Sequence, residues 1–238
     1  MFAISTESLR KSFGRVKALD SVSFDFSAGL LHGLIGSDGA GKTTTLRLLA
    51  GLLRPSAGRI RYFRDGAPSA FEAMRPSLAY MPQQASLYPD LSVAEHLEFF
   101  RELYRLDAAT FRKRSSELLE ITRLGKFSDR RAAQLSGGMY KKLGLMCALL
   151  QSPSVLLLDE PTNGVDPISR REFWELLYGL AAEKILVVVS TAYMDEAERC
   201  ARVHLLDSGR LLASGEPRAV LKAAGARSFE EIFIRSAA

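Results

Sequence analysis

Cysteine is nearly absent from this chain, which has only Cys147 and Cys200 among 238 residues. So small a number excludes a disulfide-rich secreted domain, and the separation of the two fits no metal-ligand spacing. The scarcity predicts a protein of the reducing cytosol that has no structural zinc site.

Long hydrophobic runs are also missing. The longest apolar stretches fall well short of the ~20 residues that a helix needs to cross a bilayer. The first eight residues, MFAISTES, do not combine a charged start with an apolar block, so they do not resemble a secretory signal. Any attachment to a membrane is therefore expected to depend on a partner.

A concentration of charge of one sign is lacking as well. Lys and Arg number 32 and Asp and Glu 27, and the basic residues are spread along the chain. Nucleic-acid-binding proteins normally gather their basic residues on one face. The pattern predicts a solvated surface without a nucleic-acid partner.

A hydrophobic content of 47% over this length is enough for the core of one large domain.

What the chain does contain is a glycine-rich loop at 36–43. An apolar run at 30–35 precedes it as a buried strand, and residues 44–49 follow as a helix, which is the order that phosphate-binding loops require. Backbone N–H groups of such a loop form a nest for anions at the positive end of the helix. The residues expected to hold the phosphates are Gly36, Ser37, Asp38, Gly39, Ala40, Gly41, Lys42, Thr43 and Thr44.

Four side chains around this loop predict ATP and Mg²⁺ as ligands. Lys42 supplies a point charge to the outer phosphates, and the Thr43 hydroxyl is the expected magnesium ligand. A second apolar strand ends in Asp159 and Glu160. Asp159 is placed to hold magnesium, often through water. Glu160 is placed to activate the attacking water as a general base.

The distribution of apolar residues predicts an α/β fold. Alternation near the N-terminus predicts short strands, the clearest at 22–26. Continuous apolar runs at 155–158 and 185–189 are typical of parallel strands that are covered on both faces. Between about 93 and 150 the spacing is helical, and residues 204–212 predict a hairpin with a glycine-containing turn.

The sequence LSGGM at 135–139, downstream of the phosphate loop, completes a pair of motifs that resembles the nucleotide-binding subunits of ABC transporters. The resemblance covers essentially the whole chain. It implies a P-loop NTPase with a RecA-like core, an N-terminal antiparallel β-subdomain and an inserted α-helical subdomain. It places the core in 1–84 and 153–238 and the helical subdomain in 85–152. The ending at 229–233 resembles the tail of the efflux, ABC-2-like branch.

The resemblance also assigns residues outside the phosphate loop. Phe13 matches the aromatic residue that stacks on adenine. Gln83 matches the glutamine that touches magnesium and water, with Gln84 as the alternative by one position; the LYPDL sequence at 87–91 favours Gln83. Catalytic roles then fall to Lys42, Gln83 and Glu160, and metal ligation to Thr43, Gln83 and Asp159.

The signature loop is matched by Ser136, Gly137 and Gly138. In the family this loop grips the γ-phosphate that is bound by the opposite subunit, so the resemblance implies a dimer with ATP between its subunits. Met139 replaces the usual glutamine, and Asp166 falls in the loop that crosses between the two sites.

One position departs from the family. A Thr-His pair normally follows the strand near 187–190, and the histidine contacts the γ-phosphate; here Ala192 occupies that place. None of the three histidines falls there, and a methyl group donates no hydrogen bond. Losing one such donor typically costs about 10²–10³ in turnover. Two alternatives follow. Either the chain is a slow ATPase, or Tyr193 or a residue of a partner takes the place of the missing histidine.

The resemblance implies a subunit on the cytoplasmic face of the membrane that couples ATP binding and hydrolysis to export. Its partners would be transmembrane permease subunits and a second nucleotide-binding domain, either another copy or a heterologous cassette. The aromatic residues Tyr88, Phe99 and Phe100 would either contact the permease or belong to the core. The alternatives are a weakly hydrolysing, mainly ATP-binding half of an asymmetric pair, and a non-transport ABC ATPase.

Overall fold

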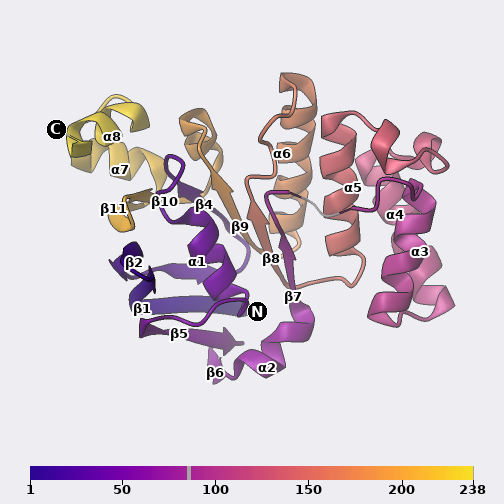
Figure 1. The fold of residues 1–238 in the computed structure, drawn as a ribbon, viewed down its shortest axis with the longest axis horizontal. Helices are drawn as coiled ribbons and strands as arrows, with labels where there is room; N and C mark the ends of the chain where they lie inside the picture. Colours follow the sequence, from indigo (N-terminus) through magenta and orange to yellow (C-terminus); the bar gives the residue numbers. More distant parts are fainter. Residues whose placement is uncertain (85–86, 238) are drawn as a thin grey trace.

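Two β-sheets and the helices around them organise the chain (Figure 1). The computed structural model describes residues 1–84 and 87–237. Among these, no helix is both long and apolar enough to cross a membrane.

The first sheet is antiparallel and is built from the N-terminal part of the chain, with the order β2-β1-β5-β6 and with β3 also paired to β1. Alternate residues of β1 are buried, as expected of a sheet with one face in the core. Its strands are β1 (Phe2–Phe13), β2 (Val16–Val22), β3 (Asp25–Ser27), β5 (Ala57–Arg64) and β6 (Ala67–Ser69).

The prediction of one continuous strand over 22–26 was wrong, because the chain forms two strands there. The side chains alternate between buried and exposed as predicted, but β2 ends at Val22 and β3 begins at Asp25. Ser21 on this side and Ser8 on the facing strand both have positive φ, 62° and 44°, and this interrupts the ladder. Phe24 between the two strands bonds instead to Thr6, through its N–H and its carbonyl.

The second sheet has the order β11-β10-β4-β9-β8-β7 and is parallel except for the final β10–β11 hairpin. That hairpin confirms the predicted glycine-containing turn, at Ser208 and Gly209. Every residue of β4, β8 and β9 is buried, as their continuous apolar sequences predict. Its strands are β4 (Leu31–Ile35), β7 (Leu78–Met81), β8 (Val155–Asp159), β9 (Leu186–Thr191), β10 (Arg202–Asp207) and β11 (Arg210–Gly215).

The two faces of this sheet belong to two hydrophobic cores. Along β8, Val155 and Leu157 join the core formed with α1 and the antiparallel sheet. Leu156 and Leu158 join the core formed with α5 and α6. Because side chains alternate along a strand, one short apolar run serves both cores.

The predicted helical region lies between β7 and β8 and forms one end of the molecule (Figure 1). Its first helix is capped by Ser92, whose hydroxyl accepts from the Glu95 N–H while the Glu95 carboxylate accepts from the Ser92 N–H. The helices are α1 (Lys42–Leu49), α2 (Phe71–Met74), α3 (Val93–Tyr104), α4 (Ala108–Thr122), α5 (Gly137–Leu149), α6 (Pro167–Ala182), α7 (Pro217–Ala224) and α8 (Phe229–Ala237). Short 3₁₀ turns are η1 (Arg75–Ser77), η2 (Gly125–Phe127), η3 (Ala132–Gln134) and η4 (Met194–Arg199).

Two buried histidines lie side by side on the neighbouring strands β4 and β10. The ring nitrogens of His32 and His204 are 3.4 Å apart, and the other nitrogen of His204 lies 2.8 Å from the Ser214 hydroxyl. Burial lowers the pKa of His32 to about 4 and that of His204 to about 3. Both rings are therefore neutral in the folded protein near neutral pH.

These histidines predict a loss of stability in weak acid. In the unfolded chain their pKa returns to about 6.5, so unfolding takes up protons once the pH falls below that value. The free energy of unfolding should be unaffected by them above pH 6.5 and should fall towards pH 4, by on the order of 1–2 kcal/mol per histidine at pH 5. Urea unfolding at pH 7 and pH 5 measures this. The double variant His32→Gln, His204→Gln should lose less stability between the two pH values, and an unchanged loss would contradict the assignment.

Candidate functional site

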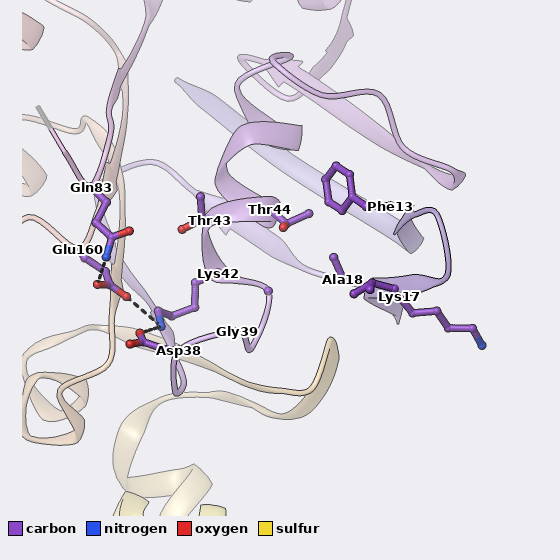
Figure 2. Close-up of a pocket in the computed structure, with 12 residues that line it drawn as sticks. Phe13, Lys17, Ala18, Asp38, Gly39, Lys42, Thr43, Thr44, Gln83 and Glu160 are labelled. Carbon is purple, nitrogen blue, oxygen red and sulfur yellow. Dashed lines mark hydrogen bonds and ion pairs between the residues drawn. The ribbon is translucent and has the colours of Figure 1, made fainter. Parts of the chain in front are cut away.

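A cavity of about 500 Å³ opens where the loop after β4, the start of α1 and the first β-hairpin meet (Figure 2). Most of the predicted site residues line it, which brings together positions far apart in the sequence. They are Phe13, Asp38, Gly39, Gly41, Lys42, Thr43, Thr44, Gln83 and Glu160, and they are joined by Val16, Lys17 and Ala18 from β2.

The loop itself is fixed by close backbone packing. A Cβ at Gly36 would come 2.2 Å from the carbonyl oxygen of Leu206 on β10, so a side chain at this position would force the two strands apart. Gly41 precedes α1 with φ of 105°, a left-handed conformation that glycine adopts without strain. Close packing thus requires glycine at position 36, and the left-handed backbone favours glycine at position 41.

Lys42 begins α1 and extends along the inside of the loop. Its ammonium donates to the carbonyl oxygens of Gly36 and Ser37 at 2.7 and 2.9 Å and lies 3.0 Å from a carboxylate oxygen of Glu160. The side chain is only 4% exposed, and a charge so buried needs such partners. These contacts keep the positive charge aimed at the cavity (Figure 2).

Asp159 ends β8 as a fully buried carboxylate. One of its oxygens accepts from the hydroxyls of Thr43 at 3.0 Å and Ser190 at 2.7 Å, and the other accepts from the Tyr80 hydroxyl at 3.1 Å. Burial, reinforced by the Asp159 charge, raises the pKa of Tyr80 to about 12, so Tyr80 stays protonated and donates.

The Thr43 hydroxyl and the Asp159 carboxylate form an oxygen-only donor set of the kind that Mg²⁺ takes. No cluster of three acidic, histidine or cysteine ligands exists in the described part of the chain. A magnesium site with few protein ligands is typical where substrate phosphates supply the others. These two residues therefore fit the predicted metal.

Glu160 follows directly, with an unusual backbone. Its φ is 46°, in the left-handed region that costs a non-glycine residue about 1–3 kcal/mol. Its N–H is held by the Ser190 hydroxyl and carbonyl at 3.0 and 3.1 Å. The strained conformation turns the carboxylate towards the cavity, where Lys42 binds one oxygen and Gln83 donates to the other at 2.8 Å.

The choice between Gln83 and Gln84 receives support from this geometry. The Gln83 amide reaches the Glu160 carboxylate and lines the cavity, whereas Gln84 does not line it. The carboxylate oxygen that Gln83 contacts also accepts from the Asn163 amide at 3.2 Å. Sequence reasoning did not single out Asn163 as a site residue.

The signature residues lie elsewhere. Ser136 caps the start of α5, where its hydroxyl accepts from the Met139 N–H at 3.3 Å, and none of Ser136, Gly137 and Gly138 lines the cavity. A Cβ at Gly138 would come 2.4 Å from the Ser169 Cβ, so this glycine permits α5 and α6 to pack closely. Asp166 caps α6 by accepting from the N–H of Ser169 at 3.0 Å.

Ala192 lies at the edge of a smaller cavity of about 120 Å³ that also touches Asp38, Glu160 and Asn163. The neighbouring Tyr193 stacks beneath the Arg170 guanidinium, 4.5 Å from the ring centre, and its hydroxyl lies 3.4 Å from the Asn163 amide oxygen. Tyr193 is thus connected to Glu160 through Asn163.

Sequence reasoning did not identify Tyr80 and Ser190, although both bind Asp159. Each lies on a strand next to β8, and Ser190 is the register partner of Asp159. Only the order of the strands brings these hydroxyls to the carboxylate, and no local signal in the sequence gives that order.

Comparison with known proteins places this geometry in a family. The profile of the ABC transporter family matches residues 19–163. The chain is 48% identical over 202 residues to the "Probable multidrug ABC transporter ATP-binding protein YbhF" of Escherichia coli strain K12, a match that covers 85% of this chain and 35% of that protein. It is 40% identical over 219 residues to the "Nod factor export ATP-binding protein I" of Ralstonia nicotianae, a match that covers 92% of this chain and 68% of that protein. The chain therefore spans about a third of the length of YbhF.

Solved structures agree. An "ATP binding subunit of ABC transporter" superposes with a TM-score of 0.83 at 30% identity over 98% of both chains. The cassette in "Dimeric Structure of MJ0796, a Bacterial ABC Transporter Cassette" superposes with a TM-score of 0.77 at 25% identity. The match covers 90% of this chain and 98% of that one. The predicted P-loop NTPase fold is confirmed, and the chain belongs to the ABC transporter family as an ATP-binding subunit.

Proposed function

We propose that this subunit binds ATP with Mg²⁺ in the cavity beside Lys42, hydrolyses it there, and couples the cycle to export by a membrane permease. The observation that supports the proposal most is the meeting of Lys42, Gln83 and Glu160 in one cavity, directly beside the buried Asp159. ATP hydrolysis is the chemistry of the family, and these side chains are the ones it requires.

The nucleotide would lie along the length of the cavity. Phe13, whose ring is half exposed at the end opposite Glu160, would stack on the adenine (Figure 2). The residues from Gly36 to Thr44 would hold the phosphates at the N-terminus of α1. Thr43, Gln83 and Asp159 would hold Mg²⁺, which when bound neutralises phosphate charge.

Glu160 would act as the general base. Its carboxylate is held on one oxygen by Lys42 and on the other by the amides of Gln83 and Asn163, so its direction is set before substrate arrives. A base that is positioned in this way takes a proton from water as the water attacks the γ-phosphate. Gln83 would orient that water.

A second nucleotide-binding domain would complete the site, because Ser136, Gly137 and Gly138 do not line the cavity of their own chain. We propose a core of 1–84 and 153–238 and a helical subdomain of 85–152. Tyr88 and Phe99 are 51% and 38% exposed and pack edge to face, which suits contact with a permease at the cytoplasmic face of the membrane. Phe100 packs against the core instead.

Export is favoured by the relatives, whose names describe multidrug transport and Nod factor export. Ala192 favours a second candidate, in which this chain is the weakly hydrolysing half of an asymmetric pair. The small cavity at Ala192 holds no imidazole that could reach a phosphate.

Lys42→Ala should abolish saturable ATP binding, because it removes the buried positive charge that faces the phosphates. Titration with a fluorescent ATP analogue in the presence of Mg²⁺ measures the Kd. The control is Lys113→Ala, which removes an exposed lysine from α4 and should leave the Kd unchanged. Equal binding by wild type and Lys42→Ala would refute the phosphate-site assignment.

Glu160→Gln should leave ATP binding intact and lower kcat by about 10²–10⁴, the range that a general base contributes. The variant keeps the size of the side chain and one acceptor oxygen. With hydrolysis blocked, ATP should hold two copies together, which gel filtration with and without ATP would detect. A monomer at saturating ATP, with the permease present, would count against the two-subunit site.

Ala192→His should raise kcat by about 10-fold or more with little change in KM, the pattern of a contact made mainly in the transition state. Steady-state phosphate release by wild type, Ala192→His and Tyr193→Phe gives the comparison. Tyr193→Phe removes only the hydroxyl that meets Asn163. Fast wild-type turnover that the new histidine does not improve, and that Tyr193→Phe reduces, would show that Tyr193 has replaced the missing contact.

A further inference from the structure

Lys141 lies where three functional segments meet. It projects from α5, shortly after the signature residues, and its ammonium donates to the carbonyl oxygen of Gln83 at 2.7 Å and to that of Glu160 at 3.4 Å. A single side chain thus joins the signature helix to the backbones of both residues that flank the proposed attacking water.

The backbone at Glu160 needs this kind of support. A left-handed non-glycine residue persists only where its surroundings hold it. On its amide side Glu160 is held by Ser190, and on its carbonyl side by the Asn163 N–H at 3.3 Å and by Lys141. Removing Lys141 would release one of the two bonds on the carbonyl side.

Charge makes the contact stronger than a neutral one. Lys141 is half buried, and burial lowers its pKa while the nearby carboxylates of Glu160 and Asp159 act in the opposite direction. A charged donor to a carbonyl gives a stronger hydrogen bond than a neutral donor.

We propose that Lys141 is a positioning residue for hydrolysis, which fixes the Glu160 carboxylate and the Gln83 amide relative to the signature end of α5. Movement of α5 would then displace the Glu160 carboxylate and the Gln83 amide together, because the same ammonium binds the backbone carbonyls of both residues. The proposal rests on the roles of Glu160 and Gln83 given above. It adds a residue that acts through them and touches no substrate.

The adjacent Lys142 supplies a matched control. It is the next residue of α5 and is more deeply buried than Lys141, but it faces the other way and pairs with the Glu172 carboxylate on α6. Replacing either lysine by methionine removes one ammonium from the same helix. Only the replacement of Lys141 removes a contact to Gln83 and Glu160.

The test is steady-state phosphate release at varied ATP by wild type, Lys141→Met, Lys141→Arg, Lys142→Met and Glu160→Gln, with thermal unfolding of each. Lys141→Met should lower kcat by about 10-fold or more, since a displacement of about 1 Å at a catalytic group can cost ~10²-fold. Its KM for ATP should stay within about 2-fold, because the contacts of Lys42 are untouched. Lys141→Arg should recover most of the kcat, and Lys142→Met should keep it within about 2-fold. Should Lys141→Met not fold, Lys141→Gln replaces it, because the shorter amide cannot reach both carbonyls.

A wild-type kcat in Lys141→Met, or an equal loss in Lys142→Met, would overturn the proposal. The Glu160→Gln arm separates this failure from a failure of the proposed function. If Glu160→Gln is inactive while Lys141→Met is normal, only the positioning role is wrong. If Glu160→Gln turns over like wild type, the proposed general base is wrong and the positioning role fails with it.

Discussion

Two adjacent buried carboxylates at the end of β8 carry negative charge into the centre of the molecule, and the arrangement around the site compensates it. Hydroxyls from α1, β7 and β9 bind Asp159, while Lys42 and two amides bind Glu160. Isolated charges at such depth are very unfavourable unless they are paired and hydrogen-bonded. The requirement explains why α1, the neighbouring strands β7 and β9, and the residues that follow β7 and β8 all supply partners to this one strand end.

The parts of this site that the sequence predicted are the local ones. The phosphate loop, the strand before it and the helix after it are contiguous, so their residue types alone predict their arrangement. The same holds for Asp159 and Glu160 at the end of an apolar run. Family resemblance, not local pattern, supplied Gln83 and Phe13, and the structure brings both to the cavity.

The parts that were missed depend on long-range order. Tyr80 and Ser190 reach Asp159 because β7 and β9 flank β8 in the sheet, and Lys141 reaches Gln83 because α5 packs beside β7. The prediction for 22–26 failed for a related reason. The predicted alternation of buried and exposed side chains was right. The break in strand pairing comes from left-handed residues on two strands, and the spacing of apolar residues gives no sign of them.

The close approach of Gly36 to Leu206 also ties the phosphate loop to a strand near the other end of the sequence. The loop begins against β10, and Gly209, just beyond that strand, donates its N–H to the Ala40 carbonyl. The nucleotide-binding unit is therefore not a modular N-terminal fragment. Its minimal autonomous piece has to extend through the β10–β11 hairpin, and any gene fusion or domain exchange that separates the two would leave the loop without one of its walls.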